Sequence, residues 1–197
     1  MSIKLDMSKA FDKVEWLFLR HMMIALGFHS TFVDIVFRCI STVSYTFLLN
    51  GSQLGNLQPH RGIRQGDPLS PYLFLICAEG FSCLLQEAKR CGSISSFRIG
   101  SRGPKLSHLL FADDTLLFGK ASLQEAQHIK TILDLYKAAS GQEVNFDKSA
   151  VVFSKNTDPT VRRSITQLLN IKEVPTHNKY LGLPTVVGRS KAEVFSS

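Results

Sequence analysis

The chain has 197 residues, of which 44% are hydrophobic and 20% are charged, a balance that is typical of a globular protein and excludes a disordered one. The formal net charge of +7 suits a polyanionic partner such as nucleic acid, although the basic residues are scattered and also suit a solvated surface. No apolar run reaches the length of a membrane span, and the four cysteines form no Cys-x-x-Cys pair. We therefore expect no membrane anchor, no zinc site and reduced, intracellular thiols.

The first elements are a short strand and two helices. We expect a strand over residues 2–5 and helices over residues 13–26 and 31–40. Asp12 and Glu15 form a capping-box pattern at the start of the first helix. Phe11 and Trp16 are spaced as a hydrophobic staple across the same start.

A hairpin and a long helix follow. Residues 43–49 have strand composition, and Asn50-Gly51 predicts a tight turn into a partner strand over residues 53–58. The long helix is expected over residues 67–90, with Asp67 as N-cap and Pro68 at the first helical position.

The second half of the chain predicts a further hairpin among strands and helices. In chain order we expect a strand at 94–99, a hairpin of strands 106–111 and 115–118, a helix at 123–139, a strand at 149–154, a helix at 160–169 and a strand at 179–181. Strands separated by helices, with clear hairpins among them, predict an α+β fold whose sheet is covered by helices on one face.

The acids at the tip of that second hairpin are the most informative feature. Asp113 and Asp114 are adjacent, and Asp6 ends the first predicted strand. Three carboxylates of this kind are what a site for two-magnesium nucleotidyl transfer requires, because magnesium prefers oxygen ligands. The alternative is a polar hairpin turn, since Asp tolerates the backbone angles of tight turns. Asp6 and Asp113 are 113 − 6 = 107 residues apart, so only the fold can unite them.

Several blocks, in order, closely resemble the palm of a reverse transcriptase, most nearly the non-LTR (LINE-type) retrotransposon enzymes of plants. They are KLDMSKAFD at 4–12, RGIRQGDPLSP at 61–71, FADD at 111–114, SGQEVNFDKS at 140–149 and KYLGLP at 179–184. The resemblance implies an antiparallel palm sheet with helices packed on one face. It also implies an RNA-directed DNA polymerase that extends a DNA primer on an RNA template with deoxynucleoside triphosphates and two Mg²⁺ ions, with Mn²⁺ as a substitute.

The resemblance also implies roles for the acids and their neighbours. Asp6 and Asp113 are the first-choice metal ligands, and Asp114 lines the same site, where it either binds a metal or orients the other groups. Lys148 matches a lysine that protonates the leaving pyrophosphate, with a plain surface lysine as the alternative. Phe11 matches the aromatic residue that lies under the sugar and rejects a 2′ hydroxyl, and the staple with Trp16 is its alternative.

Two further groups follow from the resemblance. Gln65 and Gly66 match a nucleotide-binding block, with Arg64 as a weaker candidate. Asp67 and Ser70 in the same block read as structural caps. The resemblance implies a primer contact at Tyr180, Leu181 and Gly182, with a core role as the alternative for the tyrosine.

The motifs lead us to expect a partial domain. We assign residues 1–182 to the palm and residues 183–197 to the truncated start of a thumb, with fingers and endonuclease absent. Such a fragment is expected to be weakly active or inactive alone. Its rivals are a non-catalytic nucleic-acid-binding remnant, an intron-encoded maturase palm and a purely structural product. The resemblance favours the nucleus as its location, with the cytoplasm as the alternative, and it identifies no protein partner.

Overall fold

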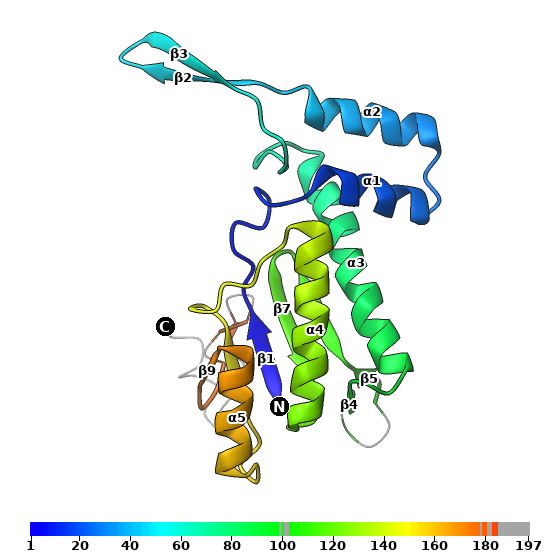
Figure 1. Cartoon of the computed structure of the whole chain (residues 1–197), viewed down its shortest axis with the longest axis vertical. Helices are drawn as coiled ribbons and strands as arrows, with labels where there is room; N and C mark the ends of the chain where they lie inside the picture. Colours follow the sequence, from blue (N-terminus) through cyan, green and yellow to red (C-terminus); the bar gives the residue numbers. More distant parts are fainter. Residues whose placement is uncertain (99, 101–102, 178, 181–182, 185–197) are drawn as a thin grey trace. The chain divides into compact units, whose positions relative to one another are not determined.

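The chain folds into two compact units. A computed structural model describes residues 1–98, 100, 103–177, 179–180 and 183–184 (Figure 1). The first unit, here the sheet unit, is made of Met1–Ser8, Ser82–Leu135 and the described residues from Glu143 onward. The second, here the helical unit, is made of Lys9–Phe81 and Tyr136–Gln142.

A five-stranded sheet organises the sheet unit, in the order β6-β7-β1-β8-β9. Its strands are β1 (Ser2–Leu5), β6 (His108–Phe111), β7 (Asp114–Phe118), β8 (Ala150–Val152) and β9 (Lys172–Glu173). All neighbours are antiparallel except β8 and β9, which are parallel. The expected antiparallel sheet is therefore confirmed for four strands and wrong for β9, because the helix α5 (Pro159–Leu169) carries the chain back to the same end of the sheet.

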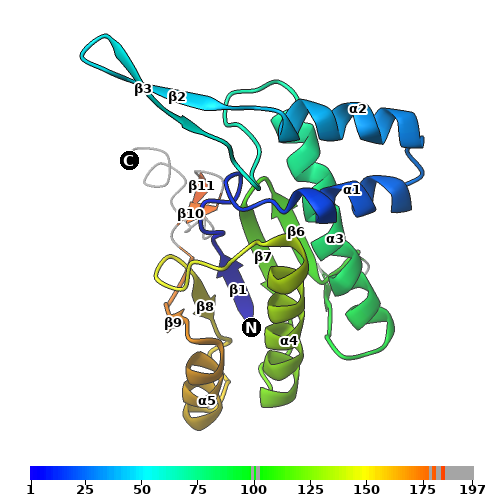
Figure 2. The same ribbon diagram turned by 45° about the horizontal axis from the view of Figure 1, so that its top comes forward.

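One face of the central strand is buried and the other is not. Ile3 and Leu5 are each 1% exposed, whereas Lys4 and Asp6 between and beyond them are only partly buried. This alternation follows from the two-residue period of a strand. The helix α4 (Leu123–Ser140) lies beside β1 and β7 in both views, and its Ala126 and Ile129 are buried (Figures 1 and 2).

Two short strand pairs complete the described part of the sheet unit. They are β4 (Phe97–Arg98) with β5 (Lys105–Leu106), and β10 (Lys179–Tyr180) with β11 (Leu183–Pro184). The strand expected at 94–99 is thus reduced to two residues, and its last residue, Ile99, lies outside the described residues.

The helical unit contains α1 (Trp16–Ala25), α2 (Ser30–Ser41), the hairpin of β2 (Tyr45–Leu49) and β3 (Ser52–Leu57), and the first part of α3 (Ser70–Arg90). The Asn50-Gly51 turn is confirmed, and both residues have the positive φ that this tight turn requires. The end of α4 belongs here because the Tyr136 ring stacks on Phe81 at 4.8 Å and its hydroxyl donates to the Cys77 carbonyl.

Two predicted helix starts are wrong. Helix α1 begins at Trp16 with Glu15 as its N-cap, so Asp12 caps nothing there and the capping box is absent. The preceding residues instead form a turn in which the Lys13 amide donates to the Lys9 carbonyl. The Phe11 ring stacks on Phe74, a contact that the expected staple with Trp16 did not predict.

Helix α3 begins at Ser70 rather than at residue 67. The Asp67 carboxylate accepts a hydrogen bond from the Leu69 amide at 2.8 Å, so Asp67 does cap the chain just before the helix. Pro68 therefore lies in the turn that precedes the helix and not at its first position. None of the described helices combines the length and apolarity needed to cross a bilayer.

Two glycines in the helical unit lie against the backbone that leads into α1. Gly62 and Gly141 have φ values of 89° and 76°. A Cβ at Gly62 would lie 2.7 Å from the Asp12 carbonyl oxygen, and one at Gly141 would collide with the carbonyl oxygen of Lys13. Both positions therefore require glycine for its backbone angle and for its missing side chain.

We expect Gly141→Ala to lower the free energy of unfolding by more than the roughly 1–2 kcal/mol that left-handed backbone alone costs. Gly92→Ala is the matched control, because Gly92 has a φ of 73° and a Cβ added there would meet no atom within 4 Å. Urea denaturation followed by circular dichroism measures both losses. Equal losses for the two variants would show that the close approach at Gly141 is unimportant.

Candidate active site

The tip of the β6-β7 hairpin carries two of the expected acids. Phe111 pairs with Asp114, so Ala112 and Asp113 alone form the turn. Ala112 has a φ of 49°, whereas the φ of Asp113 is not positive. Glycine usually fills the first position of such a turn, so the alanine stores backbone strain. Strain of this kind is typical of functional sites.

The third acid reaches the same edge of the sheet from the neighbouring strand. Leu5 pairs with Thr115, and continuing this antiparallel register places Asp6 opposite Asp114. The strand period puts Asp6 on the same face of β1 as Lys4. The fold therefore brings Asp6 to the strand that begins with Asp114, while the metal-binding role of these acids stays a prediction.

Electrostatics confirm that these groups influence one another. Burial raises the pKa of the Asp6 carboxyl, and the carboxylates of Asp113 and Asp114 raise it further. The ammonium groups of Lys148 and Lys4 act in the opposite direction on the same pKa. Lys4 Nζ also lies 3.3 Å from Asp114 Oδ1, so a lysine that the sequence motifs did not single out orients one of the acids.

The donor set has the chemistry that a magnesium ion prefers, since all three side chains offer carboxylate oxygens. Within the described ranges, however, no three His, Cys, Asp or Glu side chains gather closely enough to hold a metal ion between them. Magnesium is commonly held by one or two carboxylates together with substrate phosphates. Among the described residues the acids therefore form no closed metal cage by themselves, although their oxygens are the donors that magnesium prefers.

A segment after α4 fixes the backbone of Asp6. The Asn145 amide donates to the Asp6 carbonyl at 2.8 Å, and the Asp6 amide donates to Ser149 Oγ at 3.2 Å. Ser149 Oγ donates in turn to the Asn145 carbonyl, and the Lys148 amide donates to Asn145 Oδ1. Asn145 and Ser149 lie in one of the reverse-transcriptase-like blocks, but the only local signal of these contacts is the turn-forming tendency of Asn.

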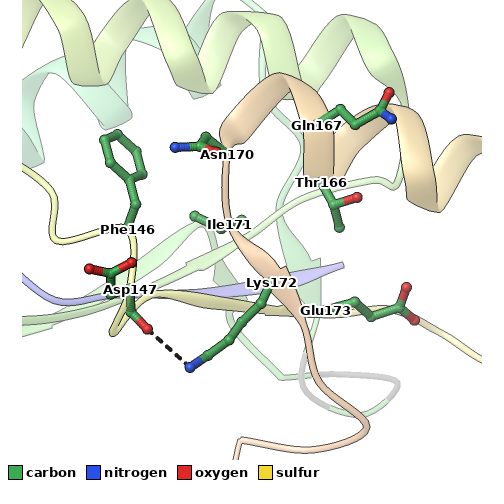
Figure 3. A pocket seen from close by; sticks show the side chains of 8 residues that line it. All are labelled: Phe146, Asp147, Thr166, Gln167, Asn170, Ile171, Lys172 and Glu173. Carbon is green, nitrogen blue, oxygen red and sulfur yellow. Dashed lines mark hydrogen bonds between the residues drawn. The ribbon is translucent and has the colours of Figure 1, made fainter.

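A cavity of about 640 Å³ adjoins this segment in the sheet unit. Figure 3 shows its lining side chains, which come from Phe146 and Asp147, from the end of α5, from the two residues that follow it and from β9. Lys172 Nζ donates to the Asp147 carbonyl at 3.0 Å (Figure 3). This bond secures the backbone next to Lys148, so the lysine that acts on Asp6 is held by its neighbour on the chain.

The helical unit brings the expected nucleotide-binding residues together. Phe11, Gln65 and Gly66 line one cavity of about 550 Å³ with Asp67, Pro68 and Pro71. The Phe11 ring stacks on Phe74 at 4.9 Å. Arg64 lies instead on a neighbouring cavity of about 590 Å³, which Gln65 also lines.

Two further predictions concern Ser70, expected to be structural, and residues 180–182, expected to contact the primer. Ser70 is buried at the start of α3, as expected of a structural residue. The backbone of Tyr180 lies in β10, whereas Leu181 and Gly182 lie outside the described residues. The primer contact therefore stays a prediction.

Removal of the Ser149 hydroxyl tests how far the backbone of Asp6 depends on it. We expect Ser149→Ala to lower the free energy of unfolding by about 1–3 kcal/mol, because the fully buried hydroxyl bonds both Asp6 and Asn145. Ser164→Ala is the control, since that hydroxyl bonds a helix carbonyl at the exposed surface. Urea denaturation gives both values, and equal losses would contradict the prediction.

The chain is similar to known proteins in both sequence and fold. A family model described as reverse transcriptase (RNA-dependent DNA polymerase) matches residues 1–185. An uncharacterized mitochondrial protein of Arabidopsis thaliana is 49% identical over 69 residues, which are 35% of this chain and 57% of that protein. A retrovirus-related Pol polyprotein from the type-1 retrotransposable element R2 of Popillia japonica is 27% identical over 98% of this chain, which spans 32% of that polyprotein.

Among solved structures, the telomerase of Candida albicans, in complex with a fragment of telomeric RNA, shares the fold with a TM-score of 0.61. It is 15% identical, and the match covers 80% of this chain and 28% of the telomerase chain. The shared fold and the family match over residues 1–185 lead to one conclusion: the chain belongs to the reverse transcriptase (RNA-dependent DNA polymerase) family.

Proposed function

We propose that the chain is the palm of an RNA-directed DNA polymerase from a LINE-type retrotransposon. It extends a DNA primer on an RNA template with deoxynucleoside triphosphates. The observation that carries the proposal is the register that places Asp6 opposite Asp114 at the tip of the β6-β7 hairpin, in a chain of the reverse transcriptase family. In this proposal residues 1–182 form the palm and residues 183–197 begin the thumb.

Asp6 and Asp113 would hold two Mg²⁺ ions through their carboxylate oxygens, and Mn²⁺ would substitute for them. When bound, paired ions activate the 3′ hydroxyl and neutralise the charge of the pyrophosphate. Asp114 is oriented by Lys4, and Lys148 supplies a proton to the leaving pyrophosphate. The influence of Lys148 on the pKa of Asp6 supports its place near the reacting groups.

Phe11, Gln65 and Gly66 form the nucleotide site of the proposed enzyme. Their shared cavity in the helical unit supports this assignment. The stack on Phe74 holds the Phe11 ring, and a ring in a fixed position excludes a 2′ hydroxyl by filling the volume that the extra oxygen needs. Arg64, which lines the neighbouring cavity with Gln65, is the weaker candidate for nucleotide binding. Residues 180–182 are proposed to contact the primer end.

The partners and location follow from the same proposal. The net charge of +7 supports binding of the RNA template and DNA primer through phosphates. The family favours the nucleus as the location, with the cytoplasm as the alternative. A second candidate is a non-catalytic nucleic-acid-binding remnant. The ion pair between Lys4 and Asp114 favours it, because this pair already engages one of the three carboxylates.

Replacing the hairpin acids separates the two candidates. We expect Asp113→Asn combined with Asp114→Asn to weaken Mn²⁺ binding about tenfold or more, because neutral amides replace two charged oxygen donors. Mn²⁺ titration followed by electron paramagnetic resonance measures the affinity, and primer extension with Mg²⁺ measures activity.

Asp134→Asn is the matched control, since Asp134 is exposed on α4. It should leave Mn²⁺ affinity unchanged. A native chain that binds Mn²⁺ no better than the double variant, and that extends no primer, would support the non-catalytic remnant and contradict the proposed enzyme.

Sugar selection tests the assignment of Phe11. We expect Phe11→Ala to reduce the preference for dGTP over GTP about tenfold or more, because removing the ring opens the volume next to the 2′ position. Equilibrium binding of each nucleotide, measured with Mn²⁺ present, gives the preference. Phe32→Ala removes an exposed ring from α2 and should leave it unchanged. An unaltered preference in Phe11→Ala would return Phe11 to a packing role against Phe74.

A further inference from the structure

The block SGQ at residues 140–142 has no role in the proposed reaction, although its last side chain is deeply buried. Gln142 is 2% exposed. Its Nε2 donates to the carbonyl of Ala10 at 2.8 Å, across 132 residues of sequence. Its Oε1 is buried and finds no hydrogen-bond partner among the described residues. A buried amide with one unsatisfied oxygen is costly, so the single bond that it does make is expected to matter.

That bond ends one residue before Phe11, in a loop that is held from two sides. On one side the Glu15 amide donates to the Ser140 carbonyl at 3.0 Å, and Gly141 lies directly against the Lys13 carbonyl. Residues 140–142 therefore contact the loop at Ala10, Lys13 and Glu15. The contact nearest to Phe11 in the sequence is the hydrogen bond of Gln142 to Ala10.

The second side of the loop is held by residues 62–63. The Gly62 amide donates to the Val14 carbonyl at 2.8 Å, and the Ile63 amide donates to the Phe11 carbonyl at 2.9 Å. Consecutive carbonyls, those of Ala10 and Phe11, are thus bound by different partners. Two fixed peptide groups in succession set the direction in which the Phe11 side chain leaves the backbone. All of these contacts lie within the helical unit.

We propose that Gln142 is a positioning residue for sugar selection. By holding the Ala10 carbonyl, it keeps the Phe11 ring stacked on Phe74 and at a constant depth in the cavity that Gln65 and Gly66 also line. The ring then fills the space of a 2′ hydroxyl without blocking a deoxyribose. This inference rests on the proposed function, and adds a residue that acts through Phe11 rather than on the nucleotide.

The test replaces Gln142 by Met, which has a similar volume and no donor. We expect Gln142→Met to reduce the preference for dGTP over GTP roughly two- to tenfold, the effect of one net hydrogen bond, with dGTP affinity itself nearly unchanged. Gln124→Met, at an exposed position of α4, is the matched control and should leave the preference as it is in the native chain. Equilibrium binding with Mn²⁺ gives each value.

A double-mutant cycle distinguishes positioning from a general loss of structure. If Gln142 acts through the ring, Gln142→Met should have no further effect on the preference in a chain that already carries Phe11→Ala. The same fold-change in both backgrounds would overturn the inference and leave the role of Phe11 intact. A native chain that shows no preference for either nucleotide would overturn the proposed function and the inference together.

Amide hydrogen exchange provides a readout that needs no nucleotide. Because the Ile63 amide donates to the Phe11 carbonyl, release of the loop in Gln142→Met should accelerate exchange at Ile63, while the amide of Val33 in α2 stays protected. Unchanged exchange at Ile63 would overturn the positioning role. If Gln142→Met fails to fold, Gln142→Asn keeps the amide but is too short to reach Ala10, and the same outcomes apply to it.

Discussion

The geometry of the candidate active site depends on the hydrogen bonds that hold the backbone of Asp6. Strand β1 ends at Leu5, yet pairing continues beyond it, through the bonds of Asp6 to Asn145 and Ser149 and through the bridge of Met7 to Val144. A residue at a free strand end frays, and a carboxylate on it samples many positions. Here the backbone at Asp6 is bonded through both its amide and its carbonyl, so its side chain is presented from a rigid support beside the β6-β7 hairpin.

The crowding of carboxylates around Asp6 lowers the stability of the folded chain. Burial and two neighbouring carboxylates raise the pKa of Asp6, which means that its charged form is less stable in the folded chain than in the unfolded one. Ala112 adds backbone strain at the hairpin tip. Lys4 and Lys148 offset part of the repulsion. A site that concentrates negative charge in this way is less stable by itself than with a cation, as expected where function outweighs stability.

The elements that could be predicted from the sequence are those whose signals lie within the element itself. The Asn50-Gly51 turn, the β6-β7 hairpin, α2 and α4 each follow from turn residues or from the spacing of apolar residues. The start of α1 did not, because the residues before it are held by distant backbone partners such as Ile63 on Phe11. The start of α3 was predicted three residues too early, because Asp67 caps a local turn through the Leu69 amide rather than the helix itself. Asp6 and Asp113 could be proposed as site residues because each lies in a recognisable motif. The supporting roles of Lys4, Asn145 and Gln142 were missed, because each of these residues contacts a partner more than a hundred residues away in the sequence.

One continuous segment, residues 140–149, supports both of the proposed functions. Its first residues bind the loop that carries Phe11 in the helical unit, and those from Glu143 onward bind the backbone of Asp6 and its neighbours in the sheet unit. Asp6 and Phe11 are five residues apart, so residues 140–149 bind a short stretch of chain that carries both side chains. The proposed roles of the two differ, since Asp6 would bind metal and Phe11 would select the sugar. Because side-chain position follows backbone position, changes in the first part of the segment should affect sugar selection and changes in the second part should affect metal affinity. The need to hold both stretches at once gives a physical reason for a block in which only Lys148 is proposed to take part in the reaction.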